Sequence, residues 1–239
     1  MIDTHCHLLP RVDDGPRSDA ESLGLARRLV EEGVTTVVCT PHFSDRFPTP
    51  SLVAQERHEE LVRELAALGL ELETAVAAEV SVPKALETSY ERLEARAIGG
   101  RFLLVELVKE TPAAAPGLVL SRLASVGLVP VFAHPERCGA VRRQPVLLDD
   151  LRDAGALVQV VAPSLAGSWG DEIWAAGWEL VESGRADLLA SDAHRASASS
   201  PQLAAVAELV EVRYGAAVRH ELTEVAPARL VEGASAAAQ

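Results

Sequence analysis

Cysteine is scarce in this sequence, because only Cys6, Cys39 and Cys138 occur among its 239 residues. Three cysteines so widely spaced do not build the disulfide framework of a small secreted protein, and their odd number fits a reducing compartment. A secretory signal peptide is also missing, since Met1 leads directly into a predicted strand. We therefore expect a cytoplasmic protein.

Long apolar runs, aromatic residues and excess positive charge are lacking as well. No apolar run approaches the ~20 residues that a membrane-spanning helix needs, so we expect no membrane insertion. Aromatic residues make up only 4% of the chain, so a buried core must consist mainly of Leu, Val and Ala. The net charge of −13 argues against a nucleic-acid-binding surface and against a face for anionic membranes.

Short apolar runs alternate with helical patterns along the whole chain. The runs that we predict as strands are residues 1–5, 34–39, 71–80, 102–108, 128–133, 156–161 and 186–190. Repeated strand–helix units imply a parallel sheet with helices outside it, so we predict an α/β fold, a distorted seven-stranded (β/α)7 TIM-like barrel. No stretch has the composition of a domain linker, and we expect a single domain over residues 1–232 with a loose tail at 233–239.

Histidine and carboxylate side chains recur at the ends of these apolar runs. In His5-Cys6-His7 the two imidazoles point to the same face of an extended strand, where they can share one metal ion. Each such residue, taken alone, is as easily an ordinary polar strand or loop residue. In TIM-like barrels, however, the chemistry gathers at the C-terminal ends of the strands. The residues that fall there are His5, His7, Asp14, His42, Glu79, Glu106, His134, Asp192 and His194.

Nine nitrogen and oxygen ligands are too many for one transition metal, so the set predicts two or three divalent ions. Imidazole mixed with carboxylate, without a thiolate, suits Mn²⁺, Fe²⁺ or Zn²⁺, and the residues do not choose among them. Clustered divalent ions lower the pKa of a bridging water and clamp both oxygens of a phosphoryl transfer. Arg137, three residues after His134, is placed to hold the remaining phosphate oxygens.

The motifs that carry these residues resemble those of the PHP (polymerase and histidinol phosphatase) superfamily. Within it, they are most similar to the bacterial manganese-dependent protein-tyrosine phosphatases of capsule and exopolysaccharide synthesis. The similarity covers roughly residues 1–200. The matching segments are MIDTHCHLLP at 1–10, VDDG at 12–15, TPH at 40–42, AHPER at 133–137 and ASDAH at 190–194.

This resemblance implies a division of the ligands and a substrate. It implies that one ion is held by His5, His7, Glu79 and Asp192, a second by Glu79, Glu106 and His134, and a third by Asp14, His42 and His194. It further implies two to three divalent ions, with Mn²⁺ favoured, and hydrolysis of phosphotyrosine on proteins. The implied partner is a bacterial tyrosine kinase of polysaccharide synthesis, and an oligomer is compatible with the sequence.

One position departs from the pattern of that group. Its members tend to carry a second phosphate-binding arginine a few residues beyond the Asp-Ala-His motif, whereas residues 197–200 here read Ser-Ala-Ser-Ser. Arg195 is the nearest cation, but in an extended chain it points away from the face of His194. We predict that the chain turns there and that Arg195 partly substitutes for the missing arginine.

Other mechanisms and functions can be weighed against this one. Cysteine-dependent tyrosine phosphatases need an arginine six positions after the nucleophile, where this chain has Val12, Asp45 and Gln144. That mechanism is excluded, and the acidic charge disfavours a nuclease. A small-molecule phosphatase, such as one acting on histidinol phosphate, stays open. So does a regulatory protein that holds metal without turnover, which the missing second arginine favours.

Overall fold

The strands of the protein form two parallel sheets. The computed structural model describes residues 1–197, 200 and 202–233. Among these residues the strands are β1 (Ile2–Cys6), β2 (Thr36–Cys39), β3 (His42–Phe43), β4 (Glu73–Val76), β5 (Glu79–Ser81), β6 (Phe102–Glu106), β7 (Val129–Ala133), β8 (Leu157–Val161) and β9 (Leu188–Ala190). One sheet has the order β1-β2-β4 and the other the order β3-β5-β6-β7-β8-β9, with parallel pairing throughout. The predicted α/β fold with parallel strands is confirmed.

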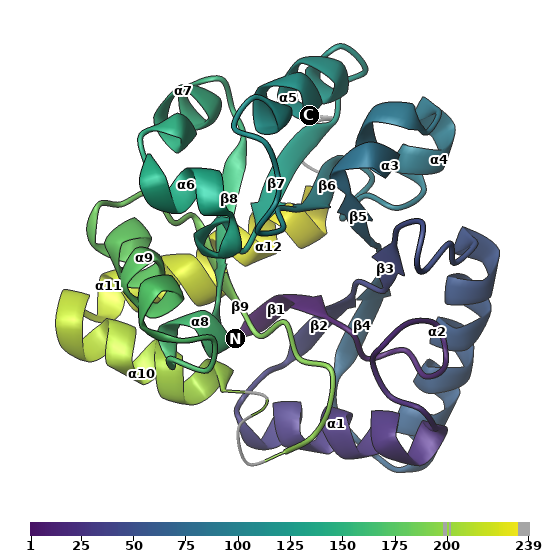
Figure 1. Cartoon of the computed structure of the whole chain (residues 1–239). Helices are drawn as coiled ribbons and strands as arrows, with labels where there is room; N and C mark the ends of the chain where they lie inside the picture. Colours follow the sequence, from purple (N-terminus) through teal and green to yellow (C-terminus); the bar gives the residue numbers. More distant parts are fainter. Residues whose placement is uncertain (198–199, 201, 234–239) are drawn as a thin grey trace.

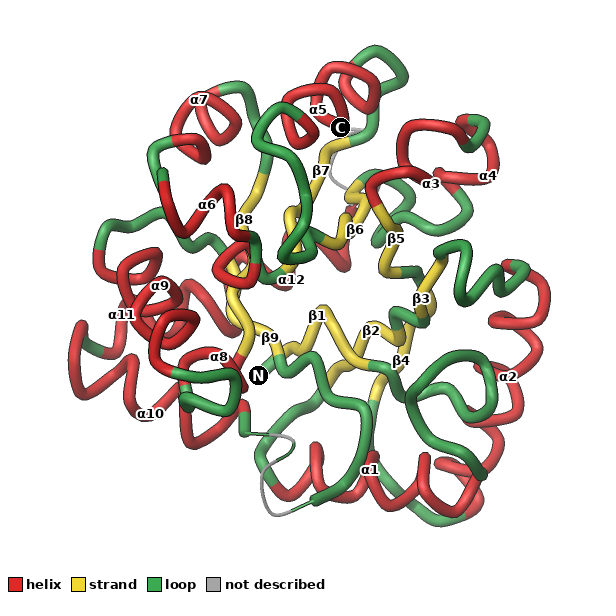
Figure 2. Tube along the Cα trace, in the orientation of Figure 1, coloured by secondary structure: helices red, strands yellow, loops and turns green. Residues whose placement is uncertain are grey.

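The seven-strand count and the closed barrel are not confirmed, because the described chain has nine strands in two sheets. The predicted strand 71–80 is interrupted at Ala78, whose amide donates to the carbonyl of Arg96. Beside it, Pro41 has no amide to donate, and the additional strand β3 begins only after this residue. The two interruptions lie side by side and separate the sheets, although the strands of both surround a common centre (Figure 2).

A second junction between the sheets lies where the first and last strands meet. Cys6 of β1 and Ala193, just after β9, form an isolated parallel bridge. The amide of Asp192 donates to the carbonyl of His5 at 2.8 Å, and the amide of His7 donates to the carbonyl of Ala193 at 2.9 Å. Backbone bonds therefore fix the ends of β1 and β9 against each other, which places two predicted ligand pairs side by side.

The helices lie outside the strands (Figure 1). They are α1 (Asp19–Glu31), α2 (Ser51–Ala67), α3 (Val82–Glu87), α4 (Tyr90–Glu94), α5 (Ala115–Ala124), α6 (Gly139–Arg143), α7 (Leu147–Asp153), α8 (Ala162–Leu165), α9 (Asp171–Glu182), α10 (Leu203–Tyr214), α11 (Ala216–His220) and α12 (Ala226–Glu232), with a 3-10 turn at Pro135–Arg137 and a π-helical turn at Glu221–Val225. No described helix combines the length and the apolar character needed to cross a membrane.

Two hydrophobic clusters lie on the two sides of the strands. The larger one fills the space between the strands and the outer helices and includes Leu25 of α1 and Leu61 of α2. A smaller cluster joins Val38, Leu104 and Leu230. Leu230 comes from α12, which passes behind the strands in Figure 1. The strands are thus packed on both faces, which leaves their C-terminal ends and the following loops to form a site.

The start of the first helix and the C-terminal end of the fold can both be compared with the sequence. Helix α1 begins after Ser18, whose hydroxyl accepts the amide of Glu21 at 3.2 Å, and the sequence Ser-Asp-Ala-Glu at 18–21 has the spacing of such a cap. Of the predicted loose tail at 233–239, residues 234–239 lie outside the described residues. Gly233 packs against Gly99, where the backbones approach so closely that neither position has room for a Cβ. Gly233 is thus packed against the fold, and a loose tail beyond it stays a prediction.

Asp3 links the two ends of the fold and should contribute strongly to stability. Its buried carboxylate accepts the hydroxyl and the amide of Ser191 and the amide of His5. Asp3→Ala leaves these buried donors without a partner, so we expect the free energy of unfolding to fall by about 2–4 kcal/mol. Urea unfolding of metal-free protein measures this change. Asp153→Ala, at an exposed helix end, is the control, and equal losses in both variants would contradict the assigned role.

Candidate metal centre

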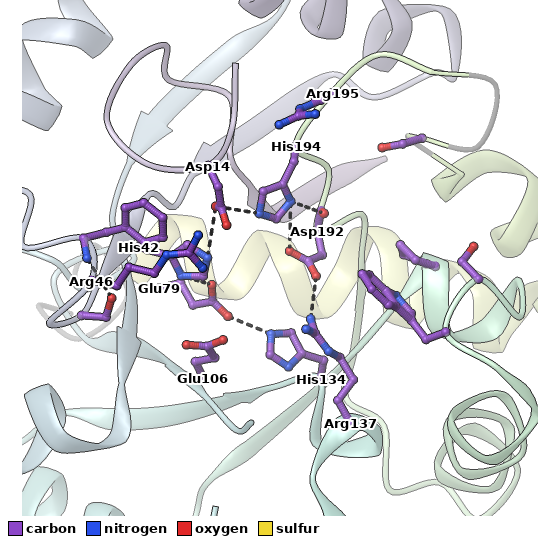
Figure 3. Close-up of a pocket in the computed structure, with 16 residues that line it drawn as sticks. Asp14, His42, Arg46, Glu79, Glu106, His134, Arg137, Asp192, His194 and Arg195 are labelled. Atoms are coloured by element: carbon purple, nitrogen blue, oxygen red, sulfur yellow. Dashed lines mark hydrogen bonds and ion pairs between the residues drawn. The ribbon is translucent and has the colours of Figure 1, made fainter. Parts of the chain in front are cut away.

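All nine predicted ligands come together at the C-terminal ends of the strands. Seven of them line a cavity of about 770 Å³, namely Asp14, His42, Glu79, Glu106, His134, Asp192 and His194. His5 and His7 lie beneath its floor and are 0% and 1% exposed. In Figure 3 the labelled carboxylates and imidazoles point towards one another from several different strands and loops. The structure therefore places the whole set in one cluster.

Four ligand atoms at the bottom of this cluster have the spacing that a metal ion requires. His5 Nε2 and His7 Nε2 are 3.3 Å apart, and Glu79 Oε2 is 3.5 Å from each. Asp192 Oδ1 is 3.4 Å from His5 Nε2 and 3.5 Å from His7 Nε2. A tetrahedral ion with bonds of about 2.1 Å separates its ligand atoms by about 3.4 Å. These five separations match that spacing, so the four residues are placed to share a single bound ion.

Glu79 extends the cluster to a second group of ligands. Its Oε1 atom lies 2.8 Å from His134 Nε2, while its Oε2 atom lies 2.9 Å from His42 Nδ1. Glu106 forms a group with His42 and Glu79 in which the ligand atoms lie within 4.8 Å of one another. Because its two oxygens face different imidazoles, Glu79 is placed to bridge neighbouring ions.

The third group lies nearer the mouth of the cavity. Asp14 Oδ1 is 3.3 Å from His194 Nε2 and 3.5 Å from His42 Nε2, and His7 also belongs to this group. The ligand atoms fall into four overlapping groups, which differ from the implied division in that His5, His7 and His42 each belong to two groups. The candidate positions are therefore contiguous and share ligands.

Residues outside the predicted set fix the orientation and protonation of the histidines. Asp13 Oδ2 is 2.7 Å from His7 Nδ1, and Gln159 Oε1 is 2.9 Å from His5 Nδ1. The Gln159 amide group donates to Thr4, so its oxygen faces His5 as an acceptor. Acceptors at Nδ1 require the proton to sit there, which leaves each Nε2 lone pair for the cluster.

The same arrangement holds His194, whose Nδ1 lies 3.0 Å from the carbonyl of Asp192. Sequence reasoning missed the roles of Asp13 and Gln159. Asp13 stands inside a recognised motif but beside the predicted ligand Asp14. Gln159 is a lone polar residue within the apolar strand β8, and that interruption was the available signal.

Two of the candidate ligands occupy a backbone conformation that side chains rarely adopt. His134 has φ 36° and Asp192 has φ 50°, and each follows directly or closely on a strand. This left-handed region costs roughly 1–3 kcal/mol for a residue other than glycine. The turn swings each side chain from the end of its strand into the cavity, where both meet the Glu79 cluster.

The charges of the cluster favour a bound cation. Burial acts to raise the pKa of Glu79, but the surrounding imidazoles, led by His5, hold that pKa well below its usual range. The close contact with His194 lowers the pKa of Asp14 to about 2. Burial and the charge of Glu79 raise the pKa of Glu106 instead. A cation beside Glu106 would therefore relieve a repulsion that the protein alone leaves in place.

Two carboxylate oxygens also lack regular hydrogen bonds. Within the described part of the chain, the buried atoms Glu79 Oε2 and Asp14 Oδ1 form no hydrogen bond of regular geometry, although imidazole nitrogens lie 2.9 and 3.3 Å from them. Such incompletely satisfied oxygens are expected where a metal ion normally takes their lone pairs. The ligand atoms, their spacing and these open lone pairs fit divalent ions.

Three arginines line the cavity around this cluster. Arg137 Nη1 is 3.3 Å from Asp192 Oδ2, which points its guanidinium towards the candidate ligands. Arg195 is exposed and also lines the cavity, above His194 in Figure 3. Arg46 is a lining residue that sequence reasoning did not single out.

The cysteines, by contrast, lie away from the cavity. Cys6, Cys39 and Cys138 are each buried to within 1% of complete. Burial raises the pKa of Cys39 to about 12 and that of Cys6 well above its usual range. A nucleophilic thiolate at either position is therefore strongly disfavoured.

Curated proteins similar to this chain are tyrosine-protein phosphatases by name. YwqE of Bacillus subtilis is 30% identical over 227 residues, which cover 94% of this chain and 89% of YwqE. The putative tyrosine-protein phosphatase CapC of Staphylococcus aureus is 33% identical over 198 residues, which cover 81% of this chain and 77% of CapC.

Solved structures similar to this chain include a tyrosine phosphatase and a more distant relative in fold. A structure reported for YwqE from Bacillus subtilis and CpsB from Streptococcus pneumoniae, described as unique metal-dependent tyrosine phosphatases, matches with a TM-score of 0.88 and 28% identity. The match covers 98% of this chain and 95% of that one. Dihydropyrimidinase from Brevibacillus agri matches over 96% of this chain and 70% of its own, with a TM-score of 0.59 and 13% identity. The second likeness concerns the fold alone.

A family model places the chain among these proteins over nearly its whole length. The model is described as capsular polysaccharide synthesis, CpsB/CapC, and it matches residues 1–232. With the 30% identity to YwqE over 94% of the chain, this match shows that the protein belongs to the CpsB/CapC family.

Proposed function

We propose that the protein is a metal-dependent phosphatase that hydrolyses phosphotyrosine on proteins involved in capsule or exopolysaccharide synthesis. The observation that carries this proposal lies beneath a cavity that Arg137 also lines. There the Nε2 atoms of His5 and His7 are 3.3 Å apart, and one carboxylate oxygen each of Glu79 and Asp192 lies 3.4–3.5 Å from both of them. The names of the family members and the structural match support the same activity.

The cofactor is two to three divalent metal ions, most readily Mn²⁺, with Fe²⁺ and Zn²⁺ as alternatives. The nine side chains His5, His7, Asp14, His42, Glu79, Glu106, His134, Asp192 and His194 hold them. The chemistry that such ions supply is a water of lowered pKa and neutralisation of charge on the phosphoryl group. Their shared ligands support more than one ion, because Glu79 presents an oxygen to each side of the cluster.

The residues of the chain bind and orient the substrate around this centre. Arg137 presents a planar guanidinium that grips two phosphate oxygens at once. Asp13 and Gln159 keep His7 and His5 protonated at Nδ1, so that their Nε2 atoms stay available. No covalent enzyme intermediate is needed, in keeping with the buried cysteines. Arg195, exposed at the mouth, gives weaker support to the phosphate.

We extend the proposal to the setting of this activity. Residues 1–232 act as one phosphatase domain in the cytoplasm, and the substrate is a bacterial tyrosine kinase of polysaccharide synthesis. The two sheets correspond to a distorted seven-unit barrel opened where β2 gives way to β3 and β4 to β5. The bridge between Cys6 and Ala193 supports this interpretation, because it joins the sheets at their other junction.

Metal removal tests the cofactor directly. We expect elemental analysis of protein purified without chelators to find two to three divalent ions per chain. Chelation should abolish hydrolysis of a phosphotyrosine peptide, and Mn²⁺ should restore it at least in part. One ion or fewer per active chain would contradict the shared-ligand arrangement.

Comparing the peptide with histidinol phosphate identifies the substrate class, and faster turnover of histidinol phosphate would overturn the proposed substrate.

The bridging position of Glu79 predicts a ranking of two carboxylates. Glu79 has four imidazole nitrogens within 3.5 Å, whereas Glu106 belongs to one ligand group only. We therefore expect Glu79→Ala to lower kcat more than Glu106→Ala, and to lose more bound metal. Metal content and steady-state kinetics of both variants measure this ranking, and an inverted order would show that Glu106 is the bridge.

The two arginines predicted to bind phosphate should differ in effect. Loss of a charge-assisted contact costs about 1.5–3 kcal/mol, or roughly 10- to 150-fold in rate. We expect Arg137→Ala to lower kcat/KM by at least this factor and Arg195→Ala to lower it by less, because Arg195 is exposed. Steady-state kinetics on a phosphotyrosine peptide gives both values. An Arg195→Ala enzyme with unchanged kcat/KM would rule out its part in substrate binding.

A further inference from the structure

Two arginine–aromatic pairs line the cavity above the metal centre, and none of their four residues is a candidate metal ligand. The Cζ atom of Arg46 lies 4.8 Å from the centre of the Phe47 ring, and that of Arg137 lies 4.9 Å from the Trp169 ring. All four side chains line the same cavity. In Figure 3 Arg46 and Arg137 enter it from different sides.

The loop that carries Arg46 and Phe47 is held in a fixed shape. The amide of Phe47 donates to the hydroxyl of Ser44 at 3.2 Å, and the amide of Ser44 donates to the carbonyl of Phe47 at 3.0 Å. Asp45, between them, forms an ion pair with Lys84 of α3. These contacts make a tight turn that presents Arg46 and Phe47 to the cavity without further ordering.

The Phe47 ring stacks on the candidate metal ligand His42. The two rings are nearly parallel, with an angle of 10° and 5.5 Å between the ring centres. Phe47 therefore continues the wall of the cavity outward from a candidate ligand. An aromatic face at this position suits a flat apolar group placed next to the phosphate.

Trp169 lines the same cavity from the segment between α8 and α9. Its side chain is 49% exposed, so part of the indole is open to a ligand in the cavity. Such an aromatic face also suits a flat apolar group. Its contact with Arg137 places it beside the guanidinium that faces the cluster.

We propose that Phe47 and Trp169 are the two walls of a subsite for the aromatic ring of the substrate, and that Arg46 binds the phosphate together with Arg137. The inference rests on the phosphatase function proposed above and names the residues that select an aryl phosphate. An aryl phosphate has an apolar ring and a doubly charged phosphate. The ring would contact Phe47 and Trp169, and the phosphate would meet the proposed metal ions and the arginines. Beside Arg195, Arg46 is a further guanidinium on the cavity lining, whereas residues 197–200 carry none.

Ligand binding, rather than turnover, tests this subsite. Isothermal titration calorimetry of Mn²⁺-loaded protein compares phenylphosphonate with methylphosphonate, which share the anion but not the ring. We expect Phe47→Leu and Trp169→Leu each to weaken phenylphosphonate by about 3- to 10-fold, with methylphosphonate changed less than about 2-fold. Phe47→Tyr and Trp169→Phe keep a ring and should restore the preference. Arg46 is exposed, as Arg195 is, so Arg46→Gln should weaken both ligands by about 3- to 10-fold, which is less than the loss expected for Arg137→Gln.

Matched controls separate this subsite from structural damage. Arg101→Gln removes an exposed arginine over Phe102 at the other end of β6 and should change neither affinity. Each variant is compared at equal metal content, because Phe47 stacks on a candidate ligand. If Phe47→Leu and Trp169→Leu weaken both phosphonates equally, the aryl subsite is overturned. If Arg46→Gln binds both phosphonates as the unaltered protein does, Arg46 takes no part in phosphate binding. Preferential phenylphosphonate binding without peptide hydrolysis would refute the proposed function alone.

Discussion

The carboxylate of Glu79 is the group on which the metal centre depends. It is only 1% exposed, and the nitrogens of four histidines lie within 3.5 Å of its oxygens. A buried carboxylate costs several kcal/mol unless opposite charge compensates it, and burial equally disfavours charge on the imidazoles. Each side of the contact therefore needs the other. The contacts of Glu79 with His5 and His7, both 3.5 Å, are also close to the separation of two ligands on one tetrahedral ion, so the centre is preorganised by its own electrostatics.

This preorganisation is supported by hydrogen bonds to the Nδ1 atoms of the histidines. Asp13, Gln159 and the carbonyl of Asp192 each engage the Nδ1 atom of one histidine. Each contact sets the orientation of the ring and places the proton on Nδ1. The lone pair of Nε2 therefore stays free to bind a metal ion. Asp3 binds Ser191 just before Asp192 and thereby fixes the end of β9 against β1. The ligand geometry thus depends on hydrogen bonds made one layer further out.

The clustering of the nine polar residues could be predicted because it depends on a local rule. Side chains that follow parallel strands gather at one edge, whatever the exact register of those strands. Gln159 and Phe47 could not be found in this way. The role of Gln159 depends on which atom of His5 it meets across the fold, and strand periodicity does not fix that contact. Phe47 lies in a loop, where no repeat in the sequence determines the direction of a side chain.

The strand count shows how a local irregularity serves the site. A continuous strand through residues 71–80, paired with an uninterrupted neighbour, would have been the simpler structure. Instead Pro41 and Ala78 interrupt the ladder, and pairing resumes with His42 opposite Glu79 as the first pair of β3 and β5. The sheet therefore restarts at the two residues whose side chains meet at 2.9 Å in the cluster. Because a change of register by one residue would turn one of these side chains to the opposite face, the register in which pairing resumes is what brings His42 to Glu79.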